Sequence, residues 1–290
     1  MAEEFHLHEA PLINLIGWSL AAGMLLYGGT DEQQAEFLPG IRTMTTVWAE
    51  GLSEPGAGSD LANLATVARR DSGDWVVRGQ KTYTTFGSRS DVLLTAVRTD
   101  PDAPARHQGL SILAVDLKAP GVTIGPLWNI AGGRQNHIFL DDVRVPRHRM
   151  IGEPGRGWEY ITRSFYSSGV PFLRHSTMQR RFAQLRRYCA ETHRAGRPLS
   201  ADLRVRGALA EMSIILETQR VLAETALSDS VHGRVSDAAA MYQVIAKESI
   251  PRFARLAYEV AGPLAHLDGE AGALGGEVHD WRPGQNQTVC

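Results

Sequence analysis

The sequence has few cysteines and no uninterrupted hydrophobic run long enough to span a membrane, and both shortages exclude classes of protein. Its two cysteines, Cys189 and Cys290, cannot form a disulfide framework, so we expect a reducing, cytoplasmic location. The most apolar stretch, residues 11–27, is interrupted by proline, asparagine, glycine and serine and is short for a membrane span. The residues before it include three glutamates but no lysine or arginine, which argues against a signal peptide. We therefore predict a buried helix and no membrane partner.

The chain also lacks a strong net charge. Its 30 basic and 32 acidic side chains leave a formal charge of −2, which gives no global bias toward nucleic acid or an anionic membrane. Hydrophobic residues make up 43% of the 290 residues and charged residues 21%, the profile of an ordinary globular protein with one large domain or two.

The hydrophobic periodicity changes twice along the chain. Residues 12–27 suit a buried helix, and a capping-box pattern at Thr30 predicts a second helix that ends before Pro39. Residues 47–149 contain short β-prone runs separated by turn residues, which predict strands. From Gly157 onward, apolar residues at helical spacing predict three long amphipathic helices. We predict an α+β fold, in which an antiparallel β-domain, a small sandwich or barrel, lies between a partial N-terminal helical segment and a C-terminal helical bundle.

The run Leu52–Asp60 reads Leu-Ser-Glu-Pro-Gly-Ala-Gly-Ser-Asp. Proline fixes its own φ angle, while Gly56 and Gly58 let the backbone come close to a ligand. Such a turn can direct several N–H groups at a planar or anionic ligand. Composition alone favours a plain loop before a helix, and the glycine spacing fits neither the Walker loop nor the G-x-G-x-x-G turn.

Two further runs follow, Gly79–Thr85 (Gly-Gln-Lys-Thr-Tyr-Thr-Thr) and Phe139–Pro146 (Phe-Leu-Asp-Asp-Val-Arg-Val-Pro), and Gly157-Trp158 comes soon after. In this order and at this spacing, the runs resemble the acyl-CoA dehydrogenase family. The Leu52–Asp60 run resembles the family's first signature, and Gly79–Thr85 resembles the next strand that contacts the flavin. Phe139–Pro146 and Gly157-Trp158 resemble the end of the family's β-domain. The resemblance implies an FAD-dependent oxidoreductase that removes two hydrogens from an acyl-CoA thioester. It also implies an electron-accepting flavoprotein and an oligomer of homologous subunits as partners.

The resemblance and the periodicity together divide the chain into four parts. We expect a remnant of an N-terminal helical domain in residues 1–46, a β-domain with the flavin and acyl-CoA contacts in 47–150, and a C-terminal helical domain in 151–265. Residues 266–290 are rich in glycine and polar side chains without periodicity, so we expect a poorly ordered or truncated tail. Compared with the family, the chain is expected to be clipped at both ends.

The resemblance implies the cofactor contacts residue by residue. Ser59 matches a position that contacts both FAD and acyl-CoA in relatives. Tyr83 stands where relatives most often have tryptophan, and its ring still offers a flat apolar face with a polar tip. Without the resemblance, residues 82–85 would be an ordinary run of β-forming residues. The implied FAD contacts are Glu50, Leu52, Ser53, Ser59, Tyr83, Thr84 and Thr85.

The resemblance further implies a carboxylate base that removes the α-proton of the thioester. Relatives supply this glutamate either from the first long helix of the C-terminal domain or from a segment that would follow Trp281. This chain has Ser167 or Ser168 at the first position. We therefore name no catalytic residue. Three glutamates lie nearby in sequence without matching either position: Glu159, Glu191 and Glu259.

Nine arginines and only two acids occupy residues 174–206. Such a cluster could bind the phosphates of CoA, FAD or nucleic acid, but a solvated helix face is the favoured explanation. Arg194 is the candidate for the FAD pyrophosphate, because Thr192 stands where several relatives have an arginine. Histidines and acids after residue 265 match no compact metal motif, and we predict no metal.

Three alternatives to a dehydrogenase stay open. The chain could be a non-catalytic subunit that pairs with a complete homologue, a truncated product without activity, or a nucleic-acid-binding relative that uses the arginine cluster. Nucleic acid is the least expected partner.

Overall fold

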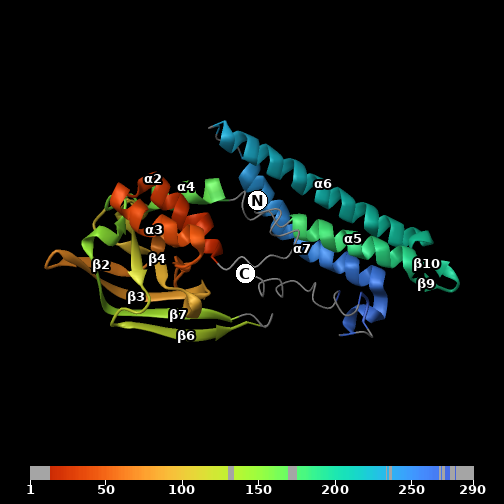
Figure 1. Ribbon diagram of the computed structural model, residues 1–290, viewed down its shortest axis with the longest axis horizontal. Coiled ribbons are helices and arrows are strands. Elements are labelled where there is room, and N and C mark those ends of the chain that lie inside the picture. The colour runs from red at the N-terminus through yellow and green to blue at the C-terminus, as the bar shows by residue number, and fades with distance from the viewer. Residues whose placement is uncertain are drawn as a thin grey trace. The chain divides into compact units, whose positions relative to one another are not determined.

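The computed structural model describes residues 14–129, 134–168, 175–232, 234, 237–267, 269, 272–274 and 278. The chain forms two compact units, one within Ile13–Ser168 and the other within Gly169–Cys290 (Figure 1). The first unit holds a β-sheet with helices before and after it, and the second is mainly helical. The predicted α+β fold, with a β-domain between helical segments, is therefore confirmed.

The first unit contains an eight-stranded sheet with the order β6-β7-β3-β2-β4-β5-β8, and β1 pairs with β4 beside this path. Most neighbours are antiparallel, but β1 and β2 run parallel to β4. The sheet is thus mixed where an antiparallel one was predicted, because an alternating pattern shows which residues face a core and not which strands are neighbours. The strands are β1 Trp48–Gly51, β2 Val67–Asp71, β3 Asp74–Thr85, β4 Val92–Arg98, β5 Leu110–Asp116, β6 Val122–Trp128, β7 Arg134–Val145 and β8 Met150–Ile151.

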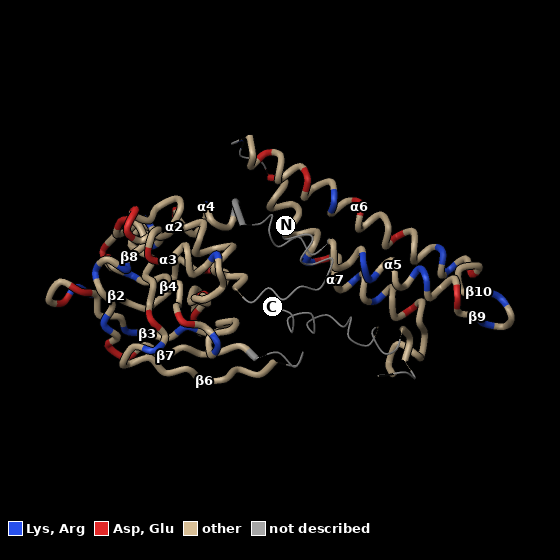
Figure 2. Tube along the Cα trace, viewed as in Figure 1, with Lys and Arg blue, Asp and Glu red and all other residues tan. Residues whose placement is uncertain are grey.

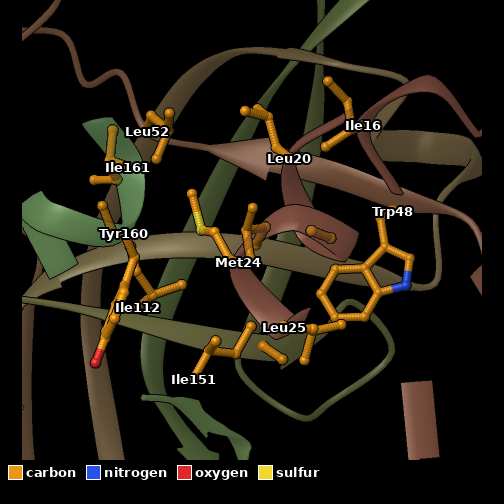
Figure 3. Close-up of a cluster of buried hydrophobic side chains, with 14 of the residues drawn as sticks. Ile16, Leu20, Met24, Leu25, Trp48, Leu52, Ile112, Ile151, Tyr160 and Ile161 are labelled. Carbon is orange, nitrogen blue, oxygen red and sulfur yellow. The ribbon is translucent and has the colours of Figure 1, made fainter. Parts of the chain in front are cut away.

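Two hydrophobic cores lie on opposite faces of the strands. Since successive strand residues point to opposite faces, β1 contributes Ala49 to one core and Trp48 to the other. The first core lies between strands and includes Val77 and Leu93. The second lies under the helices, where Met24 and its neighbours pack with Trp48 (Figure 3). Strand β1, which leads into the Leu52–Asp60 loop, is therefore held from both sides.

Helices cover the second core. Thr30 Oγ1 accepts a hydrogen bond from the Gln33 backbone N–H (3.3 Å), and the Thr30 N–H donates to Gln33 Oε1 (3.0 Å), which confirms the predicted capping box. Gln33 Nε2 also donates to the Met150 carbonyl (2.6 Å) and ties this helix to β8. The helical segments are η1 Gly17–Ala21 (a π-turn), α2 Ala22–Gly28, α3 Asp31–Thr43 and α4 Gly157–Ser168, with short 3₁₀ turns η2 Leu61–Asn63, η3 Gly87–Arg89, η4 Arg106–Gly109 and η5 Arg147–Arg149.

The predicted end of the second helix was wrong. Helix α3 continues through Pro39 to Thr43 and stops where Met44 takes a left-handed conformation with φ 58°. Proline removes a backbone hydrogen bond, but the next turn is closed by the N–H groups of Thr45 and Thr46, which both donate to the Gly40 carbonyl. These bonds end the helix one turn after its proline.

The second unit is built from α5 His175–Glu191, α6 Leu203–Val231 and α7 Ala238–Ala261. Short segments complete it: β9 His193–Arg194 paired with β10 Arg197–Pro198, η6 Leu199–Ala201 and η7 Gly262–His266. The predicted stripe of α5 is confirmed, since Met178, Leu185 and Cys189 are buried with Met212 of α6. Burial raises the pKa of Cys189 to about 11, which keeps it a core thiol. None of the described helices is long and apolar enough to cross a membrane. The predicted tail lies mostly outside the described residues.

Candidate functional site

The loop that follows β1 closes into a tight, exposed turn. The Glu54 N–H donates to the Ala57 carbonyl (2.8 Å) and the Ala57 N–H donates back to Glu54 (3.1 Å), across the predicted Pro-Gly pair. Gly56 and Gly58 stand so free that an added Cβ would meet no atom within 4 Å. Within the described residues, the N–H groups of Gly58 and Ser59 have no acceptor. We call residues 56–59 the crest; the Ala57 side chain is buried, and the exposed Gly58 and Ser59 present their amide donors to solvent.

A buried ion pair anchors this loop to β3. Lys81 is 0% exposed and Glu54 is 7% exposed, and Lys81 Nζ lies 2.7 Å from Glu54 Oε1. Lys81 Nζ also donates to the Leu52 carbonyl (3.3 Å). The Glu54 carboxylate accepts two further hydrogen bonds, from the backbone N–H groups of Ala65 (2.7 Å) and Thr66 (3.0 Å). One carboxylate therefore joins the start of the loop, its end and the neighbouring strand.

The charges of this pair respond to burial and to each other. Burial lowers the pKa of Lys81 to about 8, against the opposing attraction of Glu54. Burial acts to raise the pKa of Glu54, but Lys81 and the backbone donors outweigh it and hold that pKa below its usual value. At neutral pH both members of the pair are therefore ionised.

A β-bulge in β3 turns Tyr83 outward beside the loop. The β3–β7 register shifts between Lys81 and Thr84, and Tyr83 takes a left-handed conformation with φ 57°. Its side chain is 59% exposed. The Thr82 N–H donates to the Ser53 carbonyl (2.9 Å), so the bulge begins next to the loop. A non-glycine residue at this φ is strained, and such strain clusters at functional sites.

The structure brings most of the sequence-predicted contacts to one place. Ser53 and the segment Tyr83–Thr85 are neighbours through the Thr82 hydrogen bond, and Ser59 lies on the exposed crest of the same loop. Leu52 turns its side chain into the helix-covered core. Thr84 is buried, and its Oγ1 has no hydrogen-bond partner within the described residues.

Sequence reasoning missed Glu54 and Lys81, although both stand inside the quoted motifs. The available signal was a lysine within a strand that alternates inward and outward residues. A lysine at an inward position requires a buried acid.

Glu50 lies on β1 between Trp48 and Leu52, whose side chains share its face. It is half-buried, and burial raises its pKa above the usual value for a glutamate. Within the described residues, no cation pairs with it. The same short segment thus contains one acid with a raised pKa, Glu50, and one with a lowered pKa, Glu54.

Glu50→Gln is expected to raise the unfolding temperature of the cofactor-free protein at neutral pH. A glutamate with a raised folded pKa stabilises the fold only while protonated. That contribution is complete below the unfolded pKa of about 4.3 and is lost as pH rises through the folded pKa. Glutamine does not titrate, so variant and wild type should coincide near pH 4 and diverge at higher pH. Thermal unfolding at several pH values measures the difference; Glu159→Gln, which removes a glutamate with a lowered pKa, is the control. A shift of equal size at every pH would contradict the prediction.

Comparison with known proteins places this geometry in a family. The model of the acyl-CoA dehydrogenase middle domain matches residues 49–143, and that of the acyl-CoA dehydrogenase C-terminal domain matches residues 155–275. The chain belongs to the acyl-CoA dehydrogenase family. Members of this family are flavoprotein oxidoreductases, typically FAD-dependent. Both parts of the candidate site, the Leu52–Asp60 loop and the β3 bulge, lie within the match to the middle domain.

Several relatives show how far the similarity extends. Acyl-CoA dehydrogenase IpdE1 of Mycobacterium tuberculosis is 43% identical over 158 residues, which cover 54% of this chain and 41% of the relative. Acyl-CoA dehydrogenase FadE29 of the same organism is 33% identical over 265 residues, which cover 89% of this chain and 66% of FadE29. The chain spans about half the length, or less, of the first curated relatives it matches.

Solved structures of the family superpose closely. One is the ChsE4-ChsE5 complex from Mycobacterium tuberculosis, with 30% identity and a TM-score of 0.89 over 99% of this chain and 74% of the matched chain. Another is the Tcur3481-Tcur3483 steroid ACAD, with 26% identity and a TM-score of 0.86 over 95% of this chain and 71% of that one.

Two of the three glutamates near the expected base position in sequence, Glu159 and Glu191, are paired with other side chains. Glu159 Oε1 accepts from the Tyr27 hydroxyl (2.6 Å), and Arg156 bonds Glu159 Oε2 (2.8 Å); these hydrogen bonds hold the pKa of Glu159 below its usual value. Glu191 pairs with Arg187 (2.9 Å). Ser167 and Ser168 end helix α4, and their side chains lie outside the described residues.

The arginines of the second unit are spread along its helices among acids (Figure 2). Within the cluster of residues 174–206, Arg187 pairs with Glu191 and Arg204 lies 4.0 Å from Asp202. This pairing fits the favoured explanation, a solvated helix face. Arg194 lies in the exposed β9–β10 hairpin. The described residues contain no group of three or more His, Cys, Asp or Glu side chains that could hold a metal ion.

Proposed function

We propose that this chain binds FAD and is an acyl-CoA dehydrogenase subunit that acts on the α,β-bond of an acyl-CoA thioester. The observation that carries the proposal is the anchored loop beside the β3 bulge. This arrangement presents an exposed aromatic ring, side-chain hydroxyls and free backbone amides at one place. It combines a flat apolar surface with polar edge contacts, which a flavin ring requires. An electron-accepting flavoprotein completes the proposed set of partners.

The residues present fit a bound flavin. Tyr83 offers its exposed ring as a stacking face, while Ser53 and Thr85 flank it with hydroxyl groups that can hold the polar edge of the ring. Thr84 is buried, so its hydroxyl is not open to a ligand at this strand. Glu50 and the Leu52 backbone lie where the loop begins. For Ser59 and the crest amides we propose contacts with the anionic groups of acyl-CoA, which exposed amide donors can bind.

When bound, FAD supplies the hydride acceptor for the β-carbon of the thioester. This chain's own contribution is binding, orientation and charge stabilisation. Backbone N–H and hydroxyl donors stabilise the negative charge that develops on the thioester oxygen as the α-proton leaves. Helices α2 and α3 cover one face of the strand that leads into the loop and exclude water there.

Ser53→Ala and Thr85→Ala are each expected to weaken FAD binding several-fold. Losing one neutral hydrogen bond costs about 1 kcal/mol, which corresponds to that change in the dissociation constant. Titration of the cofactor-free protein with FAD, followed by flavin fluorescence, measures it. Ser72→Ala, in the turn between β2 and β3, serves as a matched hydroxyl deletion outside the site. Unchanged affinity in both single variants would remove Ser53 and Thr85 from the site, and no binding by the wild type would overturn the proposed function.

A second candidate function is a subunit that binds cofactor but depends on a homologous chain for catalysis. Serine at the first base position favours it, and so does the similarity to a solved complex, ChsE4-ChsE5. We propose that such a homologue supplies the missing carboxylate. Co-expression with a homologous acyl-CoA dehydrogenase chain, followed by size-exclusion chromatography, tests the pairing.

The division into a helical remnant (1–46), β-domain (47–150), helical domain (151–265) and tail (266–290) is also proposed for this chain.

A further inference from the structure

The Glu54–Lys81 ion pair is a buried charged feature that the proposed reaction does not use. A lysine is almost never fully buried unless paired, and Lys81 is fully buried. Buried ion pairs contribute little net stability, because well-packed apolar residues of similar size often serve the fold equally well. Fold stability alone therefore does not explain why two charges stand in this place.

The contacts of the pair show what it holds. Through the Leu52 carbonyl and the Ala65 and Thr66 amides, the pair fixes both ends of the segment that carries the crest. The backbone of Glu54 also closes the turn with Ala57. On the other side, Lys81 is the last residue before the register shift that turns Tyr83 outward.

We propose that Glu54 and Lys81 are positioning residues that hold the crest and the Tyr83 ring in one fixed geometry for a flavin. The inference rests on the proposed function and extends it to two residues that make no ligand contact themselves. A rigid pair of charges suits this task, because its short, directional contacts define one arrangement of loop and strand, whereas apolar packing tolerates several.

Arg98 provides a matched comparison on the same segment. From β4, its guanidinium donates to the carbonyl oxygens of Ala62 (2.7 Å) and Leu64 (3.3 Å). It therefore clamps the segment beyond the crest, without touching Lys81 or the bulge. Removing Arg98 loosens the loop's far end, while removing the Glu54–Lys81 pair frees the crest and Tyr83 together.

The pair also predicts a dependence on pH. Lys81, whose pKa burial lowers to about 8, loses its charge as pH rises through that value, and the attraction to Glu54 is lost with it. Of the titratable groups on the elements packed against Lys81, Glu54 alone acts on its charge. These groups are Glu54 in the loop, Glu50 on β1, Arg69, Arg70 and Asp71 on β2, and His137, Asp141, Asp142 and Arg144 on β7.

The test compares the full-length wild type with two variants. The double variant Glu54→Gln/Lys81→Met removes both charges and keeps one amide oxygen, which can accept from either the Ala65 or the Thr66 N–H. Arg98→Met is the control. FAD titrations from about pH 6 to about pH 9.5 give the dissociation constants, and thermal unfolding without FAD gives stability.

We expect the double variant to bind FAD about tenfold more weakly than the wild type at pH 7, with an unfolding temperature no lower than that of Arg98→Met. We also expect wild-type affinity to fall above about pH 8, while the affinity of the double variant stays constant there. A purely structural role would not produce this pH difference.

Wild-type affinity in the double variant overturns the inference and leaves the proposed function standing. Absence of FAD binding by the wild type overturns both. If the double variant does not fold, the wild-type profile decides: constant affinity across pH 8 overturns the inference, and a decrease there that Arg98→Met shares supports it.

Discussion

The FAD-loaded chain, tested by itself, is expected to oxidise acyl-CoA thioesters very slowly. A positioned general base contributes roughly 10²- to 10⁴-fold to such a step, and we expect a serine, Ser167 or Ser168, where the family's first base position carries a glutamate. Two of the three nearby glutamates are engaged by other side chains, Glu159 by Tyr27 and Arg156 and Glu191 by Arg187. The third, Glu259, is an exposed residue of α7. An anaerobic single-turnover assay with a panel of thioesters, following flavin absorbance, measures the rate.

The same assay separates the two candidate functions. Rapid bleaching by the chain alone would mean that it contains a base not identified among these residues. Bleaching that begins only when a homologous chain is added supports the subunit that depends on a partner. Ser167→Glu and Ser168→Glu provide a gain-of-function test, because a carboxylate restored at the right position should recover part of the missing rate. Glu159→Gln should leave the slow rate unchanged.

The sequence predicts the fold well where the signal is local. The Thr30 capping box needs only two residues three positions apart, and it forms as predicted. The stripe through Met178, Leu185 and Cys189 follows the helical period and is buried. Signals of this kind survive folding because each depends on backbone geometry within one or two turns.

Where the structure departs from prediction, distant residues decide the outcome. The parallel pairing of β1 with β4 joins segments more than forty positions apart, such as Trp48 and Val92, and no local pattern specifies its direction.

In the candidate site, too, some features follow from local sequence and others depend on distant residues. The Pro-Gly turn and its exposed glycines can be read from the Leu52–Asp60 motif, since proline and glycine act through their own φ angles. The bulge at Tyr83 and the pairing of Lys81 with Glu54 cannot, because both depend on how β3 meets β7 and the loop. The residues that shape the site are thus harder to predict from sequence than those expected to touch the ligand.

Trp48→Ala is expected to cause the largest loss of stability in the first unit. Trp48 is 1% exposed, and its ring meets Phe37 edge-on with centroids 5.2 Å apart beneath helix α3. Its backbone N–H donates to Asn14 Oδ1 (2.9 Å), so the residue links the N-terminal helical segment to β1. Truncating a buried tryptophan costs about 3–5 kcal/mol, a large part of the total stability of a domain.

Trp48→Phe is the matched control and should cost much less, because it retains an aromatic ring against Phe37. It also deletes the indole N–H, which is buried and has no hydrogen-bond partner within the described residues. Hydrogen exchange of peptides from β1 to β5 during denaturant unfolding isolates the first unit, since two compact units need not unfold together. Met212→Ala, in the core of the second unit, should leave that exchange unchanged. If Trp48→Ala exchanged no faster than Trp48→Phe, the stability of the first unit would not depend on this ring.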